Sequence, residues 1–250
     1  MIIDCHVHPT APGNDTRERA EHMIHFADRV NIRMMGLSLA ASFHAQPDPH
    51  QVEADNDFNR AFLDYSPARF FGYANLNPNY LQHSLDEIER CVVHGPFLGI
   101  KLWVAMTCDH PNVDAVAERA GELGAVILQH TFFRTGGNLP GESSPDDLAR
   151  LAARHPQTNF IAAHAGLNWE RGIKALIDVP NVLVDTCGFD PEMGYTEMAV
   201  RQLGAGRVVY GSDGFGRSFA SQLAKVYGAD ISDDDRAEIL SGNMKRVLGQ

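Results

Sequence analysis

The sequence lacks the features that mark secreted, membrane-spanning or disulfide-rich proteins. Its four cysteines are widely separated and include no Cys-x-x-Cys pair, which argues against a disulfide framework and a thiolate-rich structural zinc site. No apolar run approaches the ~20 residues that cross a bilayer, and the chain does not begin with a basic region followed by a long apolar stretch. We therefore expect a cytoplasmic protein that has no membrane partner.

Positive charge is also scarce. The chain has 21 Lys and Arg residues against 32 Asp and Glu residues, for a formal net charge of −11. A nucleic-acid groove requires a basic face, so we expect no nucleic-acid partner. Walker and G-x-S-x-G motifs are missing too, which gives no support to a P-loop enzyme or a serine hydrolase. An anionic substrate would have to be captured by a few local cations.

Short β-rich runs alternate with segments of helical spacing along all 250 residues. This alternation predicts one α/β domain over residues 1–250, either a parallel (β/α)8 TIM barrel or an open doubly wound sheet. An extra C-terminal helix is expected over Ser232 to Leu248, where apolar residues recur at helical spacing. The eight expected strands are Met1–Cys5, Arg33–Leu39, Phe70–Ala74, Leu98–Leu102, Ala125–Gln129, Asn159–Ala163, Val182–Asp185 and Val208–Tyr210.

Metal-ligand side chains follow four of these runs. His6 and His8 come after the first run and, being two apart on a strand, can point toward one ion. His130, His164 and Asp213 follow the fifth, sixth and eighth runs. Ligands on strands so far apart in sequence can meet only around a closed ring, which favours the TIM barrel over the open sheet.

Several short motifs resemble the amidohydrolase superfamily, and within it the amidohydrolase-2 family, which includes relatives of aminocarboxymuconate semialdehyde decarboxylase. They are Gly99-Ile100-Lys101-Leu102, His164-Ala165-Gly166, Tyr210-Gly211-Ser212-Asp213 and Gly242-Asn243. The resemblance covers the whole chain. It implies that His6, His8, His130 and Asp213 hold one divalent metal, zinc or alternatively manganese, and that His164 moves a proton. Asp213 would be both ligand and proton acceptor.

Lys101 has two interpretations. In some amidohydrolase branches a lysine at this position is carbamylated and bridges two metals, in which case His164 would bind the second ion. Only a neutral, enclosed amine takes up carbon dioxide. In the amidohydrolase-2 branch the lysine resembles a cation for a substrate carboxylate or an ion-pair partner, and one metal per chain is then expected.

Residues in loops after the strands are candidates for contacting the substrate. His44 lies in a long loop after the second strand, and Trp103 follows the fourth and could stack on a flat molecule. Arg134 follows His130, and Arg217 follows Asp213, so that either could clamp a carboxylate. The alternatives are an ordinary irregular loop around His44, a core position for Trp103, and solvent exposure of Arg134 and Arg217.

The expected activity is metal-dependent hydrolysis, in which activated water attacks a small, carboxylate-bearing amide, ester or lactone. The compact length and the Gly-Ile-Lys-Leu motif favour this interpretation. Non-oxidative decarboxylation is the alternative, because it uses the same type of metal site. A ligand-binding barrel without catalysis is disfavoured, since buried polar strand ends without a role would cost stability. The sequence is compatible with a monomer or a homo-oligomer.

Overall fold

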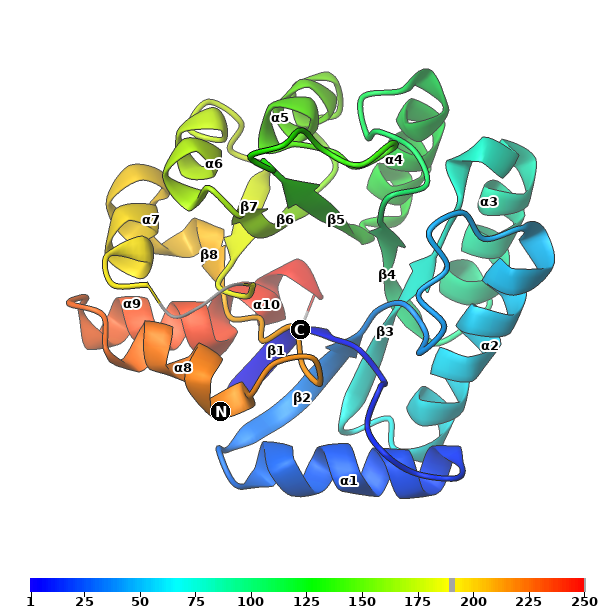
Figure 1. The fold of residues 1–250 in the computed structure, drawn as a ribbon, viewed down its shortest axis with the longest axis horizontal. Helices are drawn as coiled ribbons and strands as arrows, with labels where there is room; N and C mark the ends of the chain where they lie inside the picture. Colours follow the sequence, from blue (N-terminus) through cyan, green and yellow to red (C-terminus); the bar gives the residue numbers. More distant parts are fainter. Residues whose placement is uncertain (189–191, 250) are drawn as a thin grey trace.

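The computed structural model describes residues 1–188 and 192–249. Within them, eight parallel strands alternate with helices as a (β/α)8 TIM barrel (Figure 1). The strands are β1 Ile2–Val7, β2 Ile32–Leu37, β3 Phe70–Asn75, β4 Phe97–Leu102, β5 Val126–Phe132, β6 Phe160–Gly166, β7 Val182–Asp185 and β8 Val208–Val209. The α-helices are α1 Thr16–Asp28, α2 Pro49–Tyr65, α3 Leu81–Ile88, α4 Pro111–Leu123, α5 Pro145–Arg154, α6 Trp169–Ala175, α7 Tyr195–Leu203, α8 Phe219–Tyr227, α9 Asp233–Ala237 and α10 Asn243–Val247.

The sheet closes on itself between its first and last strands. Each strand from β1 to β8 pairs with the next one in the chain. Cys5 N then donates to Tyr210 O at 2.9 Å, and Asp213 N donates to His6 O at 2.8 Å. This closure decides between the two architectures that the sequence allowed, and it confirms the barrel.

All eight predicted strands are present, with small shifts at their ends. Strand β1 extends to Val7, so His6 lies inside the strand rather than after it. Strand β8 stops at Val209, because Tyr210 N leaves the ladder and donates to Ile239 O at 3.0 Å. No helix among the described residues is long and apolar enough to cross a membrane.

Side chains alternate between two faces along each strand. In β5, Ile127 belongs to the apolar layer between the strands and the helices, while Val126 and Leu128 belong to a separate apolar cluster inside the barrel. His130 continues the inward row toward the carboxyl end of the strand. The interior is therefore apolar at the amino ends of the strands and polar at their carboxyl ends.

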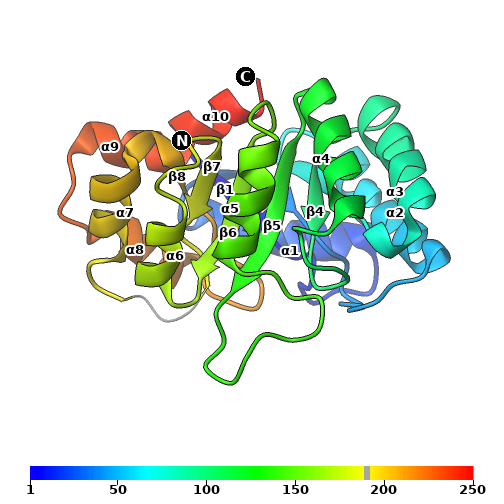
Figure 2. The ribbon, with the colours of Figure 1, turned by 90° about the horizontal axis from the view of Figure 1, so that it is seen from above.

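The C-terminal segment covers the amino end of the barrel (Figures 1 and 2). The predicted single helix is divided into α9, a π-helical turn over Glu238–Gly242, and α10. Asn243 Nδ2 donates to the carbonyl oxygens of Ala205 and Val208, both at 2.7 Å. Met244 packs into the interior apolar cluster. The opposite end of the barrel carries the loops that follow the strands.

Candidate active site

A cavity of about 330 Å³ lies at the carboxyl end of the barrel. It collects all five residues for which the sequence predicted metal binding or proton transfer, together with three of the predicted substrate contacts. Its lining is His6, His8, Thr10, Leu39, Phe43, Lys101, Trp103, His130, Phe132, His164, Asp213, Gly216 and Arg217.

Three of these side chains form a compact set of potential metal ligands. One ligand atom from each of His6, His8 and Asp213 lies within 4.8 Å of the other two. Asp213 Oδ1 is 3.1 Å from His8 Nε2 and 4.0 Å from His6 Nε2. Asp213 reaches this position from a left-handed backbone conformation, with φ of 58°.

The hydrogen bonds on the far sides of the two imidazoles show that this set fits a cation. His8 Nδ1 is 2.6 Å from the carbonyl oxygen of Ser38, so this nitrogen carries the ring proton and donates it. In the neutral ring, the Nε2 lone pair then faces Asp213 Oδ1. Two such electron-rich atoms repel each other unless a cation, either a proton or a metal ion, lies between them.

Asp185 orients His6 in a similar way. Its Oδ2 is 2.9 Å from His6 Nδ1, and both side chains are buried. A carboxylate that accepts from the outer nitrogen of a histidine leaves the inner nitrogen free to bind a metal. Burial is also the main cause that lowers the pKa of His6, and the nearby Lys101 adds to the effect. The ring is therefore neutral near pH 7, as metal binding requires.

Asp213 stays ionised although it is largely buried. Burial by itself would raise the pKa of this carboxyl group, but hydrogen bonding with His8 outweighs it and lowers the pKa. On the outer side, Arg217 Nε donates to Asp213 Oδ2 at 3.3 Å. The predicted ligand thus carries the negative charge that a divalent cation would neutralise.

His130 lines the same cavity but lies outside the three-residue ligand cluster. Its Nε2 is 3.0 Å from Glu142 Oε1. Arg134 binds Glu142 through two hydrogen bonds, of 2.6 and 2.8 Å. Burial of Glu142 opposes its ionisation, but hydrogen bonds from His130 and Arg134 prevail and lower its pKa to about 2. The structure places Arg134 on this carboxylate and not in the cavity, in contrast to its prediction as a substrate clamp.

His44 does not line the cavity either, because its loop turns at the preceding residue. Phe43 has a φ of 47° and packs against His8 and Trp103, with ring centroids 5.0 and 5.9 Å apart. His44 Nδ1 instead lies 3.8 Å from Asp55 Oδ2. The long loop after the second strand thus contributes its phenylalanine, not its histidine, to the wall.

Lys101 is completely enclosed within the site. Its Nζ lies 3.3 Å from His6 Nε2, and burial lowers its pKa to about 8. The amine is therefore mostly protonated near pH 7 and places a positive charge among the predicted ligands. The carbamylated form stays a prediction.

His164 faces the cavity from the end of β6, where the backbone leaves the regular strand conformation. Its φ is 68°, and its backbone N donates to Asp185 Oδ1 at 2.8 Å. The ring stacks on Phe132 with centroids 5.1 Å apart and planes 10° apart. Burial lowers the pKa of His164 well below its usual value, so its ring is neutral in the resting site.

Three buried residues near the site were missed by the sequence analysis. Asp185 ends the seventh predicted strand, and the rule that selected Asp213 would have selected it as well. Cys187 follows two residues later, beyond the end of β7. Glu142 could not have been found in this way, because a long loop separates it from β5.

The sequence profile of the amidohydrolase family matches residues 3–250. The chain belongs to the amidohydrolase family. A divalent metal is expected for proteins of this superfamily, in agreement with the ligand cluster around Asp213. No protein in the curated set matches the amidohydrolase chain closely enough to count as a relative.

Solved structures share the fold over nearly the whole chain. 2,6-Dihydroxybenzoate decarboxylase from Rhizobium is similar with a TM-score of 0.78 and 17% identity, over 99% of this chain and 98% of that one. A dihydroxybenzoic acid decarboxylase from Polaromonas sp. JS666, solved with manganese and 2-nitroresorcinol, has a TM-score of 0.76 and 18% identity, over 99% and 96%. 4-Oxalomesaconate hydratase from Rhodopseudomonas palustris has a TM-score of 0.73 and 16% identity, over 100% and 96%. At such identities these similarities establish the fold.

Proposed function

We propose that this amidohydrolase-family protein is a metal-dependent, non-oxidative decarboxylase of a small, flat carboxylic acid. The observation that carries the proposal is the enclosed Lys101 ammonium group inside a cavity with aromatic walls, next to three metal-ligand atoms. Two of the three similar structures named above are decarboxylases of hydroxylated benzoates, which supports this reaction over the hydrolysis that the sequence favoured.

One divalent ion would be held by His6, His8 and Asp213, with His130 beside them. Two imidazoles and a carboxylate suit zinc or manganese. When bound, the ion supplies positive charge that stabilises negative charge developing on the substrate. His6 Nε2 cannot bind the ion and accept from Lys101 Nζ at the same time. With an ion on His6, the Lys101 ammonium group would be free to serve a substrate anion.

Lys101 and the aromatic residues account for substrate choice in this proposal. The strongly acidic chain repels anions at long range, so capture of a carboxylate depends on a cation at short range. Lys101 supplies that cation within the cavity. Phe43, Trp103 and Phe132 offer apolar surfaces that suit a flat ring. The partner is thus a small organic acid, and neither a nucleic acid nor a membrane is required.

His164 is the proposed proton carrier. Its Nδ1 faces Cys187, so Nε2 is the ring nitrogen left for the substrate. Because His164 is neutral in the resting site, it must first gain a proton from the bound acid or from water. It then gives that proton to the ring carbon that bears the carboxylate. The bond from this carbon to the carboxylate breaks, its electron pair stays with the ring, and carbon dioxide leaves.

Hydrolysis is the second candidate, favoured by the same neutral His164. A neutral imidazole in the cavity can accept a proton from water as the water attacks a carbonyl group. Asp213 could share this role, as the sequence suggested. An ester or amide that carries a carboxylate fits the same cavity, and the products of the reaction separate the two candidates.

The deciding experiment supplies zinc- or manganese-loaded protein with dihydroxybenzoates and with carboxylate-bearing lactones and amides. Carbon dioxide release and acid release are followed in parallel. The proposal expects carbon dioxide from an aromatic acid, and a Lys101→Met variant should raise KM, because the cation that captures the carboxylate is lost. Acid release from lactones or amides without carbon dioxide would establish the hydrolase instead.

A further inference from the structure

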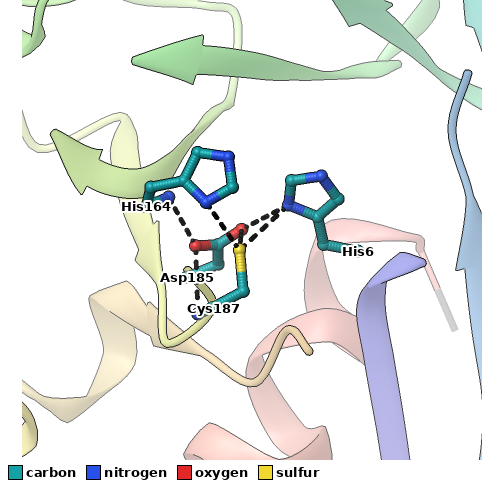
Figure 3. Close-up of side chains that lie close together, drawn as sticks. All are labelled: His6, His164, Asp185 and Cys187. Carbon is teal, nitrogen blue, oxygen red and sulfur yellow. Dashed lines mark hydrogen bonds and ion pairs between the residues drawn. The ribbon is translucent and has the colours of Figure 1, made fainter. Parts of the chain in front are cut away.

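A second cluster of potential metal ligands lies next to the catalytic set, on the opposite side of the His6 ring. It consists of His6, His164, Asp185 and Cys187, all buried, with one ligand atom of each within 4.8 Å of the others. Figure 3 shows the two imidazoles, the carboxylate and the thiol pointing toward one another from β1, from β6 and from the end of β7. Neither the catalytic ligand set nor the proposed reaction uses the Cys187 thiol.

The thiol is the centre of this cluster. Cys187 Sγ is 3.1 Å from His6 Nδ1, 3.2 Å from His164 Nδ1 and 3.1 Å from Asp185 Oδ2. The distance from His6 Nδ1 to Asp185 Oδ2 is 2.9 Å. One sulfur, two imidazole nitrogens and one carboxylate oxygen make up a donor set that zinc binds in proteins.

We propose that these four side chains form a buried binding site for a thiophilic divalent cation of the zinc type, distinct from the catalytic ion. With bonds of about 2.0 to 2.3 Å in a tetrahedron, neighbouring ligand atoms are about 3.3 to 3.6 Å apart. The four distances between ligand atoms given above are shorter than these zinc-site distances by a few tenths of an ångström. Outward side-chain movements of a few tenths of an ångström lengthen these four distances to those of a zinc site.

The two sites share the His6 ring through its opposite nitrogens. Nε2 faces Lys101 and the Asp213 carboxylate, whereas Nδ1 faces Cys187 and Asp185. Filling the buried site releases the thiol proton of Cys187. Filling both sites also removes the remaining proton of the His6 ring. The resulting imidazolate then bridges the two ions.

A second small cavity adjoins the buried cluster. It is lined by both Cys187 and His164, and it reaches outward to Glu192 and Lys225. Its volume of about 20 Å³ is enough for one water molecule or one bare ion.

Cobalt gives a direct test, because a thiolate bound to Co²⁺ produces a charge-transfer absorption band in the near ultraviolet. The chelator-treated full-length protein is titrated with Co²⁺ while absorption and bound metal are measured. The wild-type chain is expected to bind two ions and to develop the band. Saturation with one ion and no thiolate band in the wild type overturns the proposal, whether or not any variant folds.

Three variants assign the band. Cys187→Ser should bind one ion and lose the band. Asp213→Asn should lose the catalytic ion but keep the band. Cys91→Ser is the matched control, since Cys91 is a buried thiol beside Glu87 on the helix layer, and it should leave both ions and the band unchanged. A band that survives in Cys187→Ser, or that disappears in Cys91→Ser, rejects the site. These readouts do not depend on which reaction the enzyme catalyses.

Discussion

The two ends of the barrel interior are built from the same strands but serve different purposes. At the amino end, the inward residues are apolar, as with Val126 and Leu128 on β5 and Leu183 on β7. Further along the same strands the inward residues are His130 and Asp185, and both are buried polar groups with specific partners. Each strand thus joins a packed core that stabilises the fold to a polar layer that carries chemistry.

The difference also shows in the backbone. None of Val126, Leu128 and Leu183 in the apolar layer has a positive φ, whereas His164, Ala165 and Asp213 have positive φ values of 68°, 42° and 58°. Such conformations are unfavourable for residues other than glycine and are found where the surrounding structure holds them in place. The polar end is therefore kept in its geometry by the stability of the apolar end.

The largest effect is expected from Leu128→Ala, at the apolar end of β5. This side chain is completely buried, so its truncation should lower the free energy of unfolding by about 2 to 5 kcal/mol. His130→Ala, two residues along the same strand, should cost less stability while lowering activity. Denaturant unfolding and turnover of both variants test the comparison, which fails if His130→Ala is the more destabilised.

Asp213→Asn tests the polar end. It preserves shape but removes the charge and basicity, so turnover should fall by at least ~10², the usual size of a proton-transfer contribution. Asp178→Asn, at an exposed position, is the control and should keep wild-type turnover. Steady-state kinetics with metal analysis provide the measurement. Normal turnover in an Asp213→Asn protein with full metal content would remove this residue from the mechanism.

Glu142→Gln tests whether the polar layer extends into the loop after β5. The variant weakens the contacts of this side chain with His130 and Arg134, and partners of this kind typically change metal affinity or activity by about 10- to 100-fold. Glu118→Gln, on the exposed face of α4, should change neither. Metal titration and steady-state kinetics provide the measurement. If Glu142→Gln and Glu118→Gln both have wild-type metal affinity and activity, His130 acts independently of the loop.

The smallest effect concerns the helix layer and its dependence on pH. Burial opposes ionisation of Glu87, but hydrogen bonds from Arg90 and Asn56 prevail and lower its pKa below the usual 4.5. This carboxylate therefore adds stability above that pH, and the contribution is lost as the pH falls through the folded-state pKa. In unfolding experiments, the free energy of unfolding of Glu87→Gln should fall less steeply than that of the wild type as the pH is lowered. If the two proteins lose stability equally as the pH falls, the acid sensitivity belongs to other carboxylates.

Much of the site could be predicted from local sequence patterns. The strand-end rule found His6, His8, His164 and Asp213, because inward side chains at the carboxyl ends of barrel strands converge. It failed where loops decide direction. Arg134 and His44 follow strands in sequence, but Glu142 and Asp55 draw them away from the cavity. Phe43 takes the place expected for His44 through a left-handed turn that no local pattern indicated.

The sequence by itself determined the alternation of strands and helices, the amidohydrolase family and the ligand types, because hydrophobic period and residue chemistry are local properties. Only the tertiary structure decided which ligand atoms meet. Ring closure between β1 and the segment after β8 brings Asp213 to His6 and His8, from about 200 residues away along the chain. The same closure places Cys187 between two imidazoles. Distances across a closed barrel depend on strand register and backbone turns, which no single segment of the chain contains.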